Sequence, residues 1–194
     1  MSPIQEWIYQ IDQPLYDTLY TLAPRDRRRR DREVLFQIPY GGMHETKTGL
    51  KTKTFEDTNM VISGMLPSPQ SFSVTHIRCA LIGRRLFSCE SRYYRDLWLE
   101  LVVNARSVWR GPSWRCADPA TMMATPSAWL ALNSHDRTEL VSLLRRQLDP
   151  PIEIPGLENF CVRATFGDAW QEAWYAAPDR LVVLLEGKLS LAIQ

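Results

Sequence analysis

The sequence predicts an all-β fold, a two-sheet sandwich with Greek-key connections, and three observations lead to this prediction. Several separated segments alternate apolar and polar residues with a period of two, the pattern of strands that bury one face. Prolines and glycines end these segments, and the links between them are both short and long. A length of 194 residues, of which 45% are hydrophobic and 23% charged, suits one domain of this kind.

Residues 1–32 are predicted to form an N-terminal arm that begins with one or two short amphipathic helices. Trp7, Ile8 and Ile11 share one face of such a helix, and leucines continue a similar spacing to residue 22. This apolar face either packs on the core of the domain or docks on a neighbouring subunit or a membrane surface. The sequence leaves both interpretations open.

The arm ends in an arginine-rich linker. Between positions 25 and 32, six arginines and two aspartates give a charge of +4, so the rest of the chain carries −3 of the total of +1. Guanidinium groups at this density cannot be buried together, and they can pair with phosphates at low sequence specificity. A solvated charged loop explains the run about as well. The arginines are Arg25, Arg27, Arg28, Arg29, Arg30 and Arg32.

The remaining chain, residues 33–194, is predicted to be the β domain itself. Its first strand covers 33–40, and 43–53 form a loop or an exposed hairpin. The stretch 54–81 predicts two strands hinged at the Leu-Pro-Ser-Pro sequence 66–69. The reason is that proline removes a ladder donor and forces the residue before it into an extended conformation.

The second of these strands changes parity midway. A bulge near Thr75 and His76 would place all of its apolar residues on one face. Those residues are Phe72 and Val74 on one parity, and Ile77, Cys79 and Leu81 on the other.

Later segments complete a set of seven to eight strands, mostly antiparallel. Residues 97–105 and 157–166 alternate cleanly, and 181–194 form a long final strand. Residues 106–132 predict short strands within irregular loops. The leucine spacing of 134–148 predicts the one inserted helix.

Tryptophans in the less regular segments are candidate contact residues. They either fix their loops against the domain or meet a partner, and the sequence does not decide between these roles. The tryptophans are Trp109, Trp114, Trp129, Trp170 and Trp174.

The residue inventory argues against catalysis. His44, His76 and His135 form no His-x-His pair, and the four cysteines lack the short paired spacings of a zinc site. Neither a phosphate-binding loop nor a nucleophile elbow occurs. We therefore expect no enzyme, no metal, no cofactor and no small-molecule substrate. With no apolar run of about 18 residues and no signal-peptide pattern, folding in a cytoplasm is expected.

Several short motifs occur in a characteristic order along the chain. Residues 53–78 contain Asp-Thr-Asn-Met, a glycine, Leu-Pro and a strand with a phenylalanine, and the last strand contains Leu-Glu-Gly. Together these segments, about a quarter of the chain, resemble the coat proteins of tailless icosahedral bacterial viruses of the vertical jelly-roll lineage. The residues that carry the resemblance are Asp57, Thr58, Asn59, Met60, Gly64, Leu66, Pro67, Phe72 and Gly187.

The resemblance implies a single jelly roll of two four-stranded antiparallel sheets. It also implies a structural capsid protein, present in the virion after assembly in the host cytoplasm, as the major subunit or as a minor vertex protein. Its partners would be copies of itself and other capsid proteins. Their contacts would use the N-terminal apolar face and the tryptophans, while the arginine run would meet the genome or an internal membrane. The alternative is a β-sandwich module that binds carbohydrate or nucleic acid.

Overall fold

The computed structural model of the chain describes residues 7–20, 32–46, 48–82, 96–116, 147–167 and 180–193. Within these ranges the secondary structure consists of strands in antiparallel sheets and one 3-10 turn, η3 (Ser113–Arg115). The all-β prediction is therefore confirmed for the described residues. No helix among them is long and apolar enough to span a membrane.

The larger sheet, which we call the β11 sheet, is built around the last strand. β11 (Arg180–Ile193) pairs along one edge first with β2 (Leu15–Tyr20) and then with β1 (Trp7–Asp12). Its other edge pairs with β6 (Gln70–Ile82), which pairs in turn with the short strand β9 (Ile152–Ile154).

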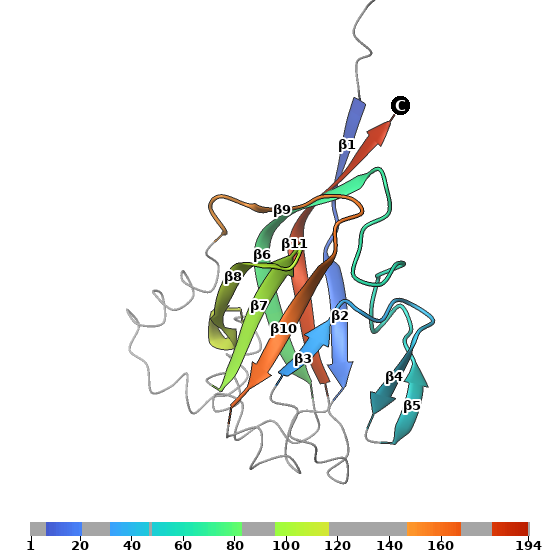
Figure 1. Cartoon of the computed structure of the whole chain (residues 1–194), viewed down its shortest axis with the longest axis vertical. Helices are drawn as coiled ribbons and strands as arrows, with labels where there is room; N and C mark the ends of the chain where they lie inside the picture. Colours follow the sequence, from blue (N-terminus) through green and yellow to red (C-terminus); the bar gives the residue numbers. More distant parts are fainter. Residues whose placement is uncertain are drawn as a thin grey trace, which may run out of the picture.

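The smaller sheet, which we call the β10 sheet, has the order β3–β10–β7–β8. The turn between its last two strands consists of Asn104 and Ala105, whose φ angles of 48° and 61° suit a two-residue hairpin. Figure 1 shows the two sheets lying one over the other. The strands are β3 (Arg32–Leu35), β10 (Phe160–Phe166), β7 (Leu97–Val103) and β8 (Arg106–Pro112).

One hydrophobic core lies between the sheets. Alternate side chains from the inner faces of both sheets belong to a single buried cluster, an arrangement consistent with a β-sandwich. The alternation predicted for β7, β10 and β11 is confirmed with two exceptions in or after β7. Val102, on the outward parity, is buried, and Ala105 lies in the turn and is exposed. The largest fully buried side chains are Phe36, Phe72, Phe160, Leu35, Met60, Leu97, Leu99, Leu101 and Ile154.

The predicted bulge in β6 is present. The register with β11 shifts there, so that His76 pairs with Glu186 and Val74 with Gly187, while Thr75 has no partner residue. The five apolar side chains on either side of the bulge are all buried. A Cβ atom at Gly187 would lie 1.9 Å from the Ser73 carbonyl oxygen, so only glycine allows this close approach of the two backbones.

A small hairpin stands apart from both sheets. β4 (Met43–Thr46) and β5 (Gly49–Thr52) pair with each other, which confirms the hairpin expected at 43–53. In Figure 1 this hairpin projects to one side of the sandwich, and the ends of β1 and β11 point away from it at another corner.

The helices predicted for the first 22 residues are wrong over the part that the structure describes. Residues 7–20 are strands β1 and β2, both paired with β11. Leu15 and Leu19 are four residues apart, a spacing that suits a helical face and also satisfies the period of two in a strand. The deciding factor is the free edge of β11, which lies more than 160 residues away in sequence.

Other boundaries differ from the sequence-based expectation. β3 ends at Leu35 because Phe36 turns inward with a φ of 67°, and residues 54–66 form turns and isolated bridges rather than a strand. The short strand β9 was not predicted. The inserted helix expected at 134–148 lies outside the described residues except for 147 and 148, which are not helical.

Candidate functional site

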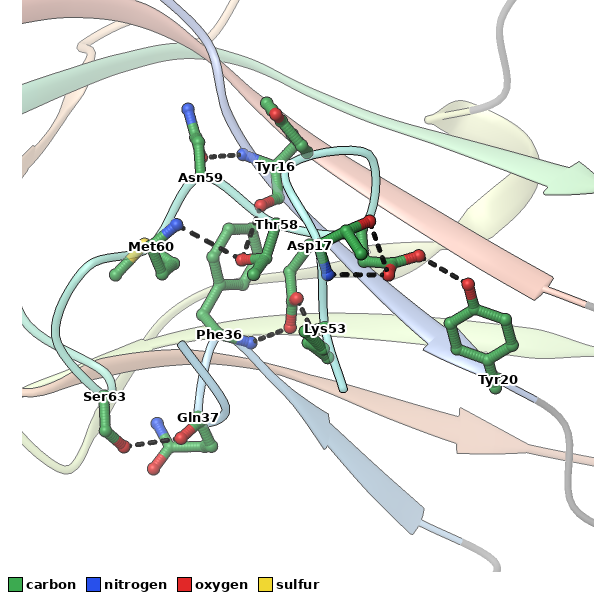
Figure 2. Close-up of polar contacts among 12 residues, drawn as sticks. Tyr16, Asp17, Tyr20, Phe36, Gln37, Lys53, Thr58, Asn59, Met60 and Ser63 are labelled. Carbon is green, nitrogen blue, oxygen red and sulfur yellow. Dashed lines mark hydrogen bonds and ion pairs between the residues drawn. The ribbon is translucent and has the colours of Figure 1, made fainter. Parts of the chain in front are cut away.

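A buried polar cluster holds the segment between β3 and β6 against the sandwich (Figure 2). It consists of Asp17, Tyr20, Lys53 and Asp57. Asp17 in β2 is 1% exposed, pairs with the Lys53 ammonium, and accepts a hydrogen bond from the Phe36 backbone N–H at 2.5 Å. Burial raises the pKa of Asp17, and the charge of Lys53 offsets this rise only in part. One carboxylate thus ties β2, the end of β3 and the base of the hairpin together.

The second carboxylate of the cluster is Asp57. It accepts hydrogen bonds from the Tyr20 hydroxyl and from the Thr54 backbone N–H, the latter at 2.9 Å, and the Lys51 ammonium lies 3.6 Å away. Burial acts to raise the pKa of Asp57, but these donors together lower it below its ordinary value. Asp57 is therefore ionised at neutral pH, and it anchors the loop after the hairpin to β2.

The next residues of the Asp-Thr-Asn-Met motif cover the edge of β2. Asn59 accepts a hydrogen bond from the Tyr16 N–H at 2.9 Å and donates one to the Pro14 carbonyl at 2.7 Å. Thr58 donates to the Tyr16 carbonyl at 3.2 Å, and Met60 is buried in the core. The motif thus satisfies backbone groups that an open strand edge would expose.

The remaining residues of the resemblance occupy the path into β6. Gly64 has a φ of 59°, and a Cβ atom there would lie 3.1 Å from the Phe160 carbonyl oxygen. Leu66 and Phe72 are buried, and the Pro67 carbonyl accepts a hydrogen bond from the Gln70 N–H at 2.8 Å in the turn before β6. Each of these residues has a role in chain path or packing.

His44 lies in β4, and its ring packs against the ring of Tyr20 at an interplanar angle of 31°, with the centroids 4.6 Å apart. It is 6% exposed, and neither ring nitrogen has a hydrogen-bond partner among the described residues. Burial, followed by the positive charge of Lys53, lowers the pKa of His44. The imidazole is therefore neutral at neutral pH.

The other face of the hairpin is exposed and carries two apolar side chains beside Glu45 and Thr52. Met43 and Leu50 are 55% and 70% exposed, and they lie diagonally across from each other on the face opposite to His44. At the hairpin base the rings of Tyr40 and Phe55 stack with centroids 3.9 Å apart, although both are exposed. We call Tyr40, Met43, Leu50 and Phe55 the hairpin surface. An exposed hairpin at 43–53 would have identified Met43 and Leu50 as candidate contact residues. No pattern in the sequence predicts the stacking of Tyr40 on Phe55.

The predicted contact residues are scattered over the fold. Trp7, Ile8 and Ile11 lie in β1, where Ile11 is half-buried opposite Leu189, and the side chains of the other two are outside the described residues. Trp109 and Trp114 are half-buried and pack against the core, which favours a role in fixing their own segments. Trp129, Trp170 and Trp174 lie outside the described residues.

Arg32 alone represents the arginine run in the described structure. It is the first residue of β3 and is exposed. Outside the described residues lie Arg25, Arg27, Arg28, Arg29 and Arg30.

Reactive groups are few in the described ranges. No group of three or more His, Cys, Asp or Glu side chains there is placed to hold a metal ion. Cys79, Cys116 and Cys161 are free thiols, and burial raises the pKa of Cys116 to about 12. The described cysteines are therefore protonated at neutral pH.

Comparisons with known proteins give no relative. No protein-family model, no curated protein and no solved structure matches this chain.

Proposed function

We propose that the two sheets form a single jelly roll. With β1 and β2 counted as one strand and the β4–β5 hairpin set aside as an insertion, eight strands remain. Their pairing is nested: first with last (β2–β11), second with seventh (β3–β10), third with sixth (β6–β9) and fourth with fifth (β7–β8). Successive pairs alternate between the sheets, as they do when a long antiparallel ribbon wraps into two Greek keys.

On this fold we propose a structural capsid protein that self-associates into the icosahedral shell of a virus, as its major subunit. The nested strand order is the observation that carries the proposal. It supports the jelly roll that the resemblance to coat proteins implies, and it comes from backbone pairing rather than from the motifs that suggested the family. In this role the chain works through its interfaces and carries out no catalytic step.

The hairpin surface is the proposed contact between copies. Its four apolar side chains lie on a projection whose position the polar cluster fixes, so a neighbouring subunit meets a preformed surface. A closed shell repeats each contact over many symmetric copies, so each contact can be weak. The β1–β11 end, with Ile11 opposite Leu189, provides a second projecting region.

A binding module for carbohydrate or nucleic acid is the alternative function, favoured by the exposed Trp98, which is 45% accessible on the β10 sheet. A minor vertex protein of the same virion is the alternative within the capsid class.

Size-exclusion chromatography with light scattering, followed by electron microscopy of the largest species, tests the proposal. A coat protein gives rings or shells as its concentration rises. A molecule that stays monomeric at high concentration, and that binds glycans, would instead be a binding module. The copy number in a purified particle then separates the major subunit from a vertex protein.

A further inference from the structure

The two sheets differ in the charge of their strands. The strands of the β10 sheet together with η3 carry five arginines against two glutamates, a net charge of +3. The strands of the β11 sheet carry three basic residues against four acidic ones, a net charge of −1. The whole chain is close to neutral at +1, so this excess is local.

Three of the arginines in the strands of the β10 sheet, Arg32, Arg110 and Arg163, lie on its outer face, whereas Arg106 is opposite the inward-facing Val103. The inner face is set by buried Leu99 and Val162, so the alternate residues Arg163 in β10 and Glu100 in β7 face outward. Arg110 in β8 pairs with Glu100, so the three residues form one row across the outer face. Arg163 and Arg110 are two strands apart, about 10 Å. Arg32 in β3 lies in the neighbouring row.

These guanidinium groups are mostly free to bind. Glu100 pairs with Arg163 at 3.5 Å. Arg32 and Arg110 are exposed, and neither has an ion pair within 4 Å in the part of the chain that the structure describes, although the charge of Arg32 helps to lower the pKa of Glu100. The other glutamate, Glu33, is opposite the inward-facing Ala164 and so lies on the other face.

An aromatic ring lies among these charges. Trp98 occupies the row of Arg32, is 45% exposed, and has the Arg110 guanidinium 5.8 Å from its ring centroid. A second pair follows in η3, where the Arg115 guanidinium is 5.3 Å from the ring of Trp114. An exposed aromatic ring among guanidinium groups is the combination with which proteins hold a nucleic-acid strand, since bases stack on the ring and phosphates pair with the arginines.

We propose that the outer face of the β10 sheet binds single-stranded nucleic acid without sequence preference. The backbone phosphates pair with Arg32, Arg110 and Arg163, and one base stacks on Trp98. A duplex offers no unstacked base to this ring. A membrane surface would favour a continuous apolar face, whereas the exposed apolar side chains here, Trp98 and Val34, lie among arginines. The inference concerns the isolated chain and does not depend on shell formation.

The test measures the anisotropy of a fluorescein-labelled oligo-dT strand, with protein at concentrations where light scattering shows monomers. The arginines at 25–30 are replaced by glutamine in every sample, so that only the sheet contributes. Trp98→Ala should weaken binding roughly 5- to 150-fold through the lost stacking. Arg32→Gln with Arg110→Gln should reduce the slope of log affinity against log salt by about 1.4, since two phosphate contacts are lost.

Arg78→Gln with Lys188→Gln, on the outer face of the β11 sheet, removes the same number of positive charges and is the matched control. It should leave the affinity within about twofold of the parent. Circular dichroism confirms that each variant is folded. Equal affinities for the control and for both sheet variants would overturn the proposal. A duplex that binds as tightly as oligo-dT would also overturn it. So would tighter binding to phosphatidylserine vesicles than to oligo-dT, if the same variants abolish the vesicle binding.

Discussion

Residues 36–60 carry the hairpin surface and, in Lys53 and Asp57, the two members of the polar cluster that pair with Asp17 and Tyr20 of β2. This stretch inverts the usual distribution of side chains. Lys53 and Asp57 are 4% and 1% exposed, whereas Leu50 and Phe55 are 70% and 62% exposed. Lysine and aspartate are among the residues least often buried in proteins. The buried charges hold the hairpin in place, and the hairpin exposes apolar side chains that, in the proposed function, contact another copy of the chain.

The largest expected change in the free energy of unfolding follows the loss of one buried charge. Lys53→Met leaves Asp17 buried without its counter-charge, so the free energy of unfolding should fall by about 3–5 kcal/mol in urea titrations. The double variant Asp17→Leu/Lys53→Met removes both charges and should recover a large part of that loss. A single variant as stable as the parent would mean that the ion pair does not hold the segment.

The pH dependence of stability tests whether buried His44 is held neutral. Because the pKa of His44 is lowered below its ordinary 6.5, the unfolded chain takes up this proton at a higher pH than the folded chain. Stability should therefore be complete above about pH 6.5 and fall by up to about 1.4 kcal/mol per pH unit as the pH decreases toward the folded pKa. Lys51 and Lys53 disfavour the charged ring, and only Asp57 opposes them.

The matched variant is His44→Phe, compared with the parent by urea unfolding at pH 7.5 and pH 5.5. The free energy of unfolding of the parent should fall relative to that of the variant between pH 7.5 and pH 5.5, and contributions from other histidines cancel in this comparison. Asp57 does not contribute in this range, since its lowered pKa places its titration below about pH 4. An unchanged difference at both pH values would show that His44 is not held neutral.

The smallest effect on stability is expected at the hairpin surface. Met43→Lys with Leu50→Lys should change the free energy of unfolding by less than about 0.5 kcal/mol per site, because both side chains are largely exposed. Val108→Lys with Leu157→Lys, at exposed apolar positions elsewhere, is the matched control. A large loss of stability in the hairpin variant alone would mean that the hairpin surface packs on its own domain.

The sequence predicts the periodic parts of this fold well and the contacts between distant segments poorly. The parity change in β6 predicts the bulge, because five apolar residues must share one face and a single extra residue achieves this. The same reasoning fails for β2, where leucines four residues apart fit a helix and a strand alike. The polar cluster was not predicted, since Asp17 and Lys53 are 36 residues apart and Asp17 lay in a presumed helix.

Sedimentation velocity of the parent, the hairpin variant and its control at one protein concentration tests the central claim most directly. If residues 36–60 hold an apolar surface in place for other copies, the parent and the control should sediment as large assemblies and the Met43→Lys/Leu50→Lys variant as a folded monomer. Identical sedimentation of the parent and the hairpin variant, whether as monomers or as assemblies, would contradict the account.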